Sequence, residues 1–213
     1  MTFAGSSRIR DLSHPSQNAG IVRATAMDIE ALIRAERWAG ARGLIKKQLK
    51  KDPRNHWLLA RLGLTYYEQR QYEKALAYEE AALEIQPNCP LALWDYAGSL
   101  QMLGRHREAL DVYERITQQG PEQIAVSQCG EGRGWAKGLV ADCYYRMTDS
   151  LKALGDEAGA YEMLVKHLDM RGPGCYSIYP LEGPRGEVRP RPQGRRSGRA
   201  NAQSQTGVAS RRR

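Results

Sequence analysis

The sequence feature that most constrains the fold is a recurrence of small residues and prolines at intervals of 34 positions. The small residues are Ala41, Ala75 and Ala109, and the prolines are Pro53 and Pro87. A fixed period of this length is typical of proteins built from stacked units, each too small to bury its own apolar face. The chain is therefore expected to fold as an array of similar units rather than around one central core.

Residues 57–87 indicate that one unit consists of two amphipathic helices. The first helix carries apolar or small residues at spacings of three, one and three, namely Leu59, Leu62, Gly63 and Tyr66. The second helix carries Ala75, Ala82 and Leu83. Each set shares one helix face, because residues three and four positions apart lie on the same side. Pro87 ends the second helix, since proline has no N–H and its ring clashes with the preceding turn.

This unit resembles the tetratricopeptide repeat, whose pattern is W-x2-L-G-x2-Y followed by A, F and P. Leu59 replaces the usual tryptophan, and Glu79 replaces the usual large aromatic residue, with Tyr78 one position earlier. The resemblance implies that the small residues lie where helices cross and that the prolines close the units. The repeat-packing residues implied in this way are Leu62, Gly63, Tyr66, Ala41, Ala75, Ala109, Ala160, Pro53 and Pro87.

The resemblance implies an all-α, right-handed α-solenoid of helix–turn–helix repeats. Three repeats are expected at 22–55, 56–89 and 90–119. A fourth, at 141–170, follows an insertion at 120–140, because LKALGDEAGAYEML aligns with LQMLGRHREALDVY and places Ala160 51 positions after Ala109. Residues 1–20 are expected to form a disordered arm, 171–182 an extended cap and 183–213 a disordered Arg-rich tail.

Local signals predict where several helices begin and end. The first helix is expected to start near Met27. Gly104 suits the left-handed residue that closes a helix. Gly120-Pro121 breaks the pattern, and the glycine-rich segment after it lacks the Walker sequence of a phosphate-binding loop. That segment is interpreted either as a flexible loop or as an early extension of a helix that is clear from Trp135 onward.

The last helix of an array has no neighbouring repeat, so its outer stripe needs a cap. This stripe consists of Tyr161, Leu164, Val165 and Leu168. The segment that follows carries alternating apolar residues between breakers, namely Tyr176, Ile178, Tyr179 and Leu181. We expect it to lie across the stripe as an extended strap, since burying these side chains is favourable.

The family resemblance also implies a concave groove that is lined by the first helix of each pair and binds peptides of partner proteins. The expected groove residues are Trp57, Arg61, Leu64, Tyr67, Leu91, Trp94, Asp95, Gln101, Asp142, Tyr145, Arg146 and Asp149. Trp57 and Trp94 fit the groove and the space between helices equally well. Members that grip the carboxylate end of chaperones use Lys and Asn at fixed positions, where this chain has Ala60, Leu64, Leu91 and Asp95. A chaperone carboxylate clamp is therefore absent, and the expected partner is an unknown protein or peptide.

The basic character of the chain lies in its tail. The net charge is +8, and residues 181–213 hold nine Arg against two Glu, a net of +7, which leaves about +1 for residues 1–180. An Arg-rich arm can bind nucleic acid through counterion release, so a nucleic-acid-associated adaptor is the alternative function. A solubilising tail, or a reading-frame artefact of a GC-rich coding sequence, explains the same composition.

No catalytic, metal or cofactor site is predicted. The four histidines are isolated, and the four cysteines lie far apart without a C-x-x-C pair, which favours a reducing, cytoplasmic compartment. Arg133 near Cys129 could lower the pKa of that thiol. No apolar run approaches about 18 residues, so no membrane contact is expected. The expected function is a non-catalytic protein–protein interaction scaffold.

Overall fold

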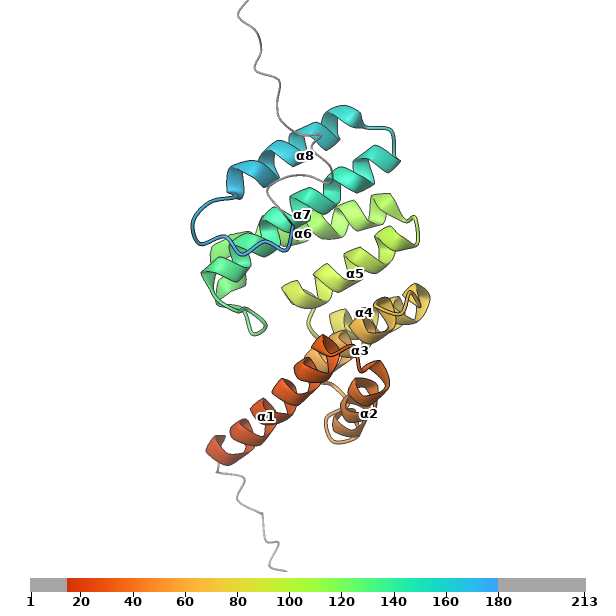
Figure 1. The fold of residues 1–213 in the computed structure, drawn as a ribbon, viewed down its shortest axis with the longest axis vertical. Coiled ribbons are helices and arrows are strands. Elements are labelled where there is room, and N and C mark those ends of the chain that lie inside the picture. Colours follow the sequence, from red (N-terminus) through yellow and green to blue (C-terminus); the bar gives the residue numbers. More distant parts are fainter. Residues whose placement is uncertain (1–14, 180–213) are drawn as a thin grey trace, which may run out of the picture. The chain divides into compact units, whose positions relative to one another are not determined.

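The computed structural model describes residues 15–179, with side chains from residue 25 onward, and helices are the regular secondary structure of this part of the chain (Figure 1). The helices are α1 (Pro15–Arg34), α2 (Trp38–Leu49), α3 (His56–Tyr67), α4 (Tyr72–Ile85), α5 (Pro90–Met102), α6 (His106–Ala125), α7 (Arg133–Ala153) and α8 (Glu157–Met170). The all-α prediction is confirmed. The predicted arm before residue 15 and the predicted Arg-rich tail lie outside the described residues.

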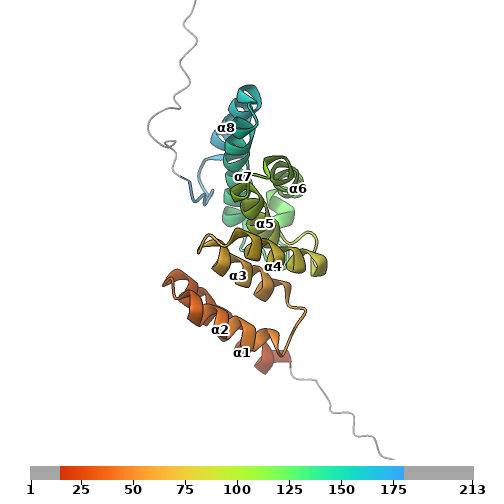
Figure 2. The ribbon, with the colours of Figure 1, turned by 90° about the vertical axis from the view of Figure 1, so that its right-hand side faces the viewer.

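The helices form four consecutive pairs that stack in chain order. Each helix packs against the next one along the chain, and α3 also packs against α5 (Figures 1 and 2). A hydrogen-bond pair joins α5 to α7, because Gln101 Nε2 donates to the Arg146 carbonyl oxygen and to Ser150 Oγ, both at 3.0 Å. The first helices of successive pairs therefore lie beside one another, which is the arrangement of an α-solenoid.

Small residues allow the two helices of a pair to approach closely. Ala41, Ala75, Ala109 and Ala160 are fully or almost fully buried. A Cβ atom added to Gly63 would lie 2.8 Å from Glu79 Cγ and 3.2 Å from the Ala75 carbonyl oxygen. Leu62 is buried in a cluster with Ile29, Ile45 and Leu58, and Tyr66 stacks on Tyr78 with ring centroids 5.5 Å apart. Pro53 and Pro87 follow the ends of α2 and α4.

The turn inside each pair repeats one backbone conformation. A residue with positive φ stands in all four turns, namely Glu36 (55°), Arg70 (57°), Gly104 (75°) and Gly155 (81°). The prediction for Gly104 is confirmed, since glycine adopts this left-handed region without strain. Glu36 and Arg70 hold the same conformation at a cost of about 1–2 kcal/mol each.

Two boundaries differ from those predicted. Helix α1 begins at Pro15, well before Met27, because proline is favoured at a first helical position and the residues after it include good helix formers. Residues 15–20 therefore belong to a helix and not to a disordered arm. The prediction relied on the apolar stripe around Ile29 and Leu32, which begins only later in the same helix.

The insertion at 120–140 is also more helical than a loop. Gly120 (φ 71°, ψ 160°) kinks α6, and the helix then continues to Ala125. Helix α7 begins at Arg133, two residues before Trp135, so each of the two interpretations of the segment holds for part of it: residues 133 and 134 extend the helix and residues 126–132 form a loop. Only residues 126–132 connect the two helices. The kink arises because glycine at 120 adopts a backbone conformation closed to other residues, and Pro121 starts a new helical turn.

The extended segment after α8 does not cover the outer stripe of that helix. The ring of Tyr161 stays 57% exposed and Val165 37% exposed. The segment runs along α7 instead, where the backbone N–H of Tyr176 donates to the Gly134 carbonyl oxygen at 3.0 Å. Gly138 permits this approach, since a Cβ there would collide with the Tyr176 carbonyl group. The prediction of a cap over α8 is therefore wrong for the described residues 171–179, which we call the strap.

Candidate functional site

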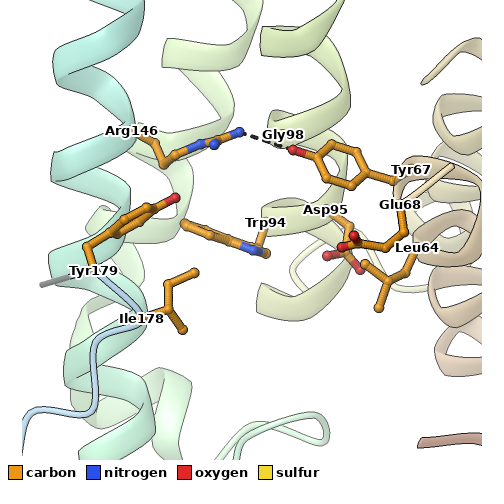
Figure 3. Close-up of a pocket in the computed structure, with 9 residues that line it drawn as sticks. All are labelled: Leu64, Tyr67, Glu68, Trp94, Asp95, Gly98, Arg146, Ile178 and Tyr179. Atoms are coloured by element: carbon orange, nitrogen blue, oxygen red, sulfur yellow. Dashed lines mark hydrogen bonds between the residues drawn. The ribbon is translucent and has the colours of Figure 1, made fainter. Parts of the chain in front are cut away.

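A hollow of about 160 Å³ opens between α3, α5, α7 and the strap. Figure 3 shows its lining residues, which are Leu64, Tyr67, Glu68, Trp94, Asp95, Gly98, Arg146, Ile178 and Tyr179. Each of the three helices is the first helix of its pair. The hollow therefore lies on the face where the family resemblance predicts a groove.

Arg146 and Tyr67 close the hollow on one side by a hydrogen bond that spans α7 and α3. Arg146 Nη2 donates to Tyr67 Oη at 3.4 Å (Figure 3). Its Nε donates to Tyr113 Oη at 3.2 Å. Gly98 of α5 lies between these groups and leaves space for both. A Cβ at Gly98 would lie 3.5 Å from the Tyr67 ring and 3.7 Å from Arg146 Nη2. The guanidinium group is thereby held in place at the wall of the hollow.

Trp94 belongs both to the wall and to the core. Its ring meets Tyr113 edge to face, with centroids 5.8 Å apart, and it packs on the main apolar cluster while lining the hollow. Trp57 is placed differently, because it packs on the cluster of Ile29, Ile45, Leu58 and Leu62 and lines a second hollow elsewhere. The two tryptophans thus have different surroundings, although the sequence presented them as equivalent.

A buried ion pair joins α3 to α5 at one end of the hollow. Arg61 Nη2 lies 3.2 Å from Asp95 Oδ2, and Nη1 lies 3.4 Å from Glu30 Oε1. Burial raises the pKa of Asp95 to about 6, although the charge of Arg61 opposes the rise. Arg61 and Asp95 occupy the same position in consecutive repeats, 34 residues apart. The pair therefore links the two repeats.

The strap lies against α7 in the manner of a bound extended peptide. The backbone N–H of Ile178 donates to Asp142 Oδ2 at 2.9 Å, and the Ser177 hydroxyl donates to Asp142 Oδ1. The Tyr179 ring stacks on Tyr145 with centroids 4.2 Å apart. Arg171 Nη1 donates to the Tyr179 carbonyl oxygen at 2.6 Å. One carboxylate and one ring of α7 therefore hold residues 177–179, and Arg171 at the start of the strap donates to their far end.

The predicted groove residues separate into groups. Those that line the hollow are Leu64, Tyr67, Trp94, Asp95 and Arg146, and those that hold the strap are Asp142 and Tyr145. Gln101 is buried between α5 and α7, and Leu91 packs on an apolar cluster with Ala60 and Cys89. Asp149 is exposed outside the lining, whereas Arg61 is buried in its ion pair.

Four lining residues were absent from the sequence-based set, namely Glu68, Gly98, Ile178 and Tyr179. Gly98 follows Trp94 by four positions, so helical spacing places it on the same face and is the signal that identifies it. Nothing local in the sequence places Ile178 and Tyr179 beside α3 and α5. Their position depends on where the chain turns back after α8.

The structure also brings together three residues that appeared isolated in the sequence. His56, Cys89 and Cys129 place their ligand atoms within 4.8 Å of one another. The Cys129 thiol donates to the Cys89 sulfur, which lowers the pKa of Cys89 to about 7 and raises that of Cys129. Burial lowers the pKa of His56. Cys129 therefore does not carry the lowered pKa that was expected from Arg133.

Paired helices stacked in order, with a hollow along their first helices, define a repeat scaffold of the α-solenoid class. The tetratricopeptide-repeat family matches the sequence over residues 29–90 and again over 66–128. Together these two matches span residues 29–128, which contain tetratricopeptide repeats, and the family resemblance of the sequence is confirmed. Proteins of this family are generally non-catalytic interaction scaffolds. No curated protein sequence matches the chain.

Solved structures share the fold. YrrB, described as a tetratricopeptide-repeat protein with an unusual peptide-binding site, is 23% identical, with a TM-score of 0.54 over 70% of this chain and 68% of its own. MamA is 21% identical, with a TM-score of 0.53 over 67% and 74%. The ArsTM double mutant of MamA from RS-1 is 16% identical, with a TM-score of 0.55 over 70% and 74%. Within residues 15–179, none of the helices has the length and apolarity needed to cross a membrane.

Proposed function

We propose that this protein is a non-catalytic protein–protein interaction scaffold that binds an extended peptide of a partner in the hollow between α3, α5 and α7. The observation that supports this proposal is the strap, which already lies along α7 as an extended peptide. The backbone N–H groups of Tyr176 and Ile178 donate to the Gly134 carbonyl oxygen and to Asp142 on α7, and the strap residue Tyr179 stacks on Tyr145. A partner peptide would use the same kinds of contact.

The chemistry of the hollow favours a peptide with one aromatic or aliphatic anchor and polar backbone contacts. Trp94 and Tyr67 offer ring surfaces, and Arg146 offers a guanidinium group to a carbonyl or carboxylate oxygen. Glu68 and Asp95 place acidic groups at the other side. Aromatic and arginine side chains are the residues that most often dominate binding energy at interfaces. The peptide-binding description of YrrB is consistent with this use of the fold.

A test uses the strap as its own probe. In a full-length variant with Ser177, Ile178 and Tyr179 replaced by glycine, the strap contacts are lost and the α7 surface is vacated. A fluorescent peptide with the sequence of residues 173–179 should bind this variant in trans and bind the unmodified chain much more weakly, because the tethered strap competes at high effective concentration.

Further substitutions in the variant with glycine at 177–179 show where the peptide binds. Tyr145→Ala should weaken peptide binding by roughly tenfold or more, since it removes the stacking partner. Tyr161→Ala, which removes an exposed tyrosine from α8, serves as the control and should leave the affinity unchanged. Two results would contradict a peptide site on this face. One is equal peptide affinity with and without Tyr145→Ala and Tyr161→Ala in the variant with glycine at 177–179, and the other is the absence of peptide binding.

The alternative function, a nucleic-acid-associated adaptor, rests on the nine Arg residues of 181–213. Binding through this segment should be electrostatic, with an affinity for DNA or RNA that falls steeply as salt rises. A salt titration of the full chain and of a chain ending at residue 182 separates the two functions. Loss of a steep salt dependence on truncation would favour the adaptor.

A further inference from the structure

We propose that His56, Cys89 and Cys129 form a binding site for a thiophilic metal ion, with Zn²⁺ as the preferred occupant. The His56 Nε2 and Cys129 Sγ atoms are 3.1 Å apart, and all three ligand atoms lie within 4.8 Å of one another. Tetrahedral zinc has Zn–S distances of about 2.3 Å and Zn–N distances of about 2.0–2.1 Å, which places neighbouring ligand atoms roughly 3.5–3.8 Å apart. The His56–Cys129 separation is slightly shorter than this range and no separation exceeds 4.8 Å, so small side-chain movements suffice to close around the ion.

Three separate elements supply the ligands. His56 is the first residue of α3, Cys89 immediately precedes α5, and Cys129 lies in the α6–α7 connection. The Asn55 side chain accepts from the Leu58 N–H and fixes the start of α3 next to His56. The sequence separations are 33 and 40 residues, which explains why no local metal-binding spacing is visible. The site exists only because the repeats stack.

The α6–α7 connection is folded so that Cys129 reaches the other two residues. The Gly130 N–H donates to the Ser127 carbonyl oxygen at 2.9 Å, which turns the chain next to Cys129. A Cβ at Gly130 would collide with the carbonyl groups of Ile124 and Ala125, so only glycine allows the connection to lie this close to the end of α6. The insertion that separates the third and fourth repeats therefore has a defined position, and Cys129 is its inward-facing side chain.

The surroundings suit a metal-bound thiolate. Cys89 is 2% exposed and His56 7% exposed, and an apolar cluster that contains Ala60, Ala82 and Ala92 surrounds Cys89. Cys89 is the N-cap of α5, and the first backbone N–H groups of a helix have no partner within the helix. Such N–H groups and the helix dipole favour a negative charge there. Soft thiolate and imidazole ligands select Zn²⁺ and Cu⁺ over the hard ions Mg²⁺ and Ca²⁺.

Access to the cluster comes from the second hollow. This hollow, of about 290 Å³, is lined by Ala26, Asp52, Arg54, Asn55, His56, Trp57, Gln128 and Cys129. No fourth His, Cys, Asp or Glu joins the group among the side chains of residues 25–179. Three protein ligands with an open fourth position are the pattern of a zinc site that keeps an exchangeable solvent ligand. Binding one ion displaces the thiol protons to solvent, with no change of oxidation state.

The test is a metal titration of the full chain. The protein, reduced and stripped of metal with a chelator that is then removed, is titrated with Zn²⁺ against a chromophoric competitor, and separately with Co²⁺. We expect one ion per chain, a sub-micromolar dissociation constant for Zn²⁺, and a thiolate-to-cobalt charge-transfer band with the visible bands of a tetrahedral site. Zinc should also raise the melting temperature, because it binds the folded chain preferentially.

Two variants and a matched control locate the site. Cys129→Ser and His56→Asn should each weaken Zn²⁺ binding by roughly 100-fold or more and abolish the cobalt band. Cys175→Ser removes another half-buried cysteine that is outside the cluster, so it should bind as the unmodified chain does. Circular dichroism checks that each variant is folded.

The proposal is overturned by three outcomes. The first is the absence of stoichiometric binding, and the second is equal affinity of the unmodified chain and Cys129→Ser. The third is a count of two free thiols instead of four in the metal-free, mildly reduced chain, since a Cys89–Cys129 disulfide would remove both sulfur ligands. Cu⁺ bound in place of Zn²⁺, with the same dependence on Cys129, would support the site and reassign its ion.

Discussion

Glu79 shows how one residue can depart from the family pattern and still be accommodated. It occupies the position where a large aromatic residue is usual and is fully buried beneath Gly63. Neither carboxyl oxygen has a hydrogen-bond partner among the described residues. Burial, followed by the nearby charge of Asp95, raises the pKa of Glu79 to about 8. The folded chain therefore holds Glu79 protonated at neutral pH.

Replacement of Glu79 by glutamine should change how stability depends on pH. Between the ordinary pKa of 4.5 and the raised value of about 8, the folded state keeps a proton on Glu79 that the unfolded state has released. The stabilisation of the folded state that results is complete below pH 4.5 and is lost as pH rises through 8. The full difference corresponds to at most about 5 kcal/mol. Glu79→Gln should therefore be more stable than the unmodified chain at pH 9 and show a flatter profile.

Urea denaturation between pH 5 and pH 9 measures this effect. The control is Glu84→Gln, an exposed glutamate on the same helix, which should retain the pH dependence of the unmodified chain. Parallel profiles for Glu79→Gln and the unmodified chain would mean that Glu79 is ionised in the folded state.

A second residue-scale prediction compares two helical glycines. A Cβ at Gly63 would meet Glu79 and the Ala75 carbonyl oxygen, whereas nothing lies within 4 Å of one at Gly43. Gly63→Ala should lower stability by about 1–3 kcal/mol through overpacking. Gly43→Ala should raise it by about 0.5–1 kcal/mol, because alanine is the better helix former. Chemical denaturation of both variants tests the repeat register. Gly63→Leu or Ala75→Trp should lower the free energy of unfolding further than Gly63→Ala does. A stable Gly63→Leu variant would show that the helices are not in contact there.

The strap illustrates how an element without regular secondary structure can be held by a helix. Its anchors are hydrogen bonds to Asp142 and the stacked rings of Tyr145 and Tyr179. Burial raises the pKa of Asp142, and the hydrogen bonds from Ser177 and Ile178 oppose that rise. Without the strap, the carboxylate of Asp142, which is buried in the folded chain, would lose both donors.

Truncations on either side of the strap should separate its contribution from that of the tail. A chain that ends at Arg171 loses the contacts to Asp142 and Tyr145, and its melting temperature should fall by roughly 5 °C or more, since about 1 kcal/mol shifts a chain of this size by 2–4 °C. A chain that ends at Leu181 keeps these contacts and should melt close to the full chain. Identical melting temperatures for the two truncations would show that the strap contributes nothing to stability.

The described part of the molecule is unevenly packed along its length. The main apolar cluster draws its buried residues from α4 to α7, with Tyr113, Leu93, Leu100 and Ile116 fully buried. The cluster around α1 and α2 contains only Ile29, Ile45, Leu58 and Leu62 as buried members. In a solenoid each repeat is stabilised by its neighbours, so an end repeat with few buried residues opens more readily.

Native-state hydrogen exchange should reveal this gradient. Amides of α5, α6 and α7 should show the greatest protection, and those of α1 and α2 should exchange fastest, because opening the first pair exposes little buried apolar surface. Peptide-level mass spectrometry of the full chain measures both regions in one experiment. Uniform protection from α2 to α7 would indicate that the repeats unfold as a single cooperative unit.

Much of the fold follows from local signals in the sequence. The 34-residue period, the paired helical stripes, the prolines after the first two pairs and the left-handed turn at Gly104 depend on residues within one repeat. Helix propensity, steric restriction and apolar periodicity are therefore enough to predict them. The start of α1 and the continuation of α6 beyond Gly120 were missed, because both segments are helical without a strong apolar stripe.

The candidate sites depend on contacts between residues far apart in the chain, which only the tertiary structure decides. The family resemblance put Arg146 and Gln101 in the same predicted groove, yet Gln101 is buried with its amide bonded to α7, whereas Arg146 lies at the hollow. The strap could equally have covered α8, but the space above Gly134 and Gly138 gives it a closer fit to α7. His56, Cys89 and Cys129 meet for the same reason, because stacking brings together residues that no single repeat contains.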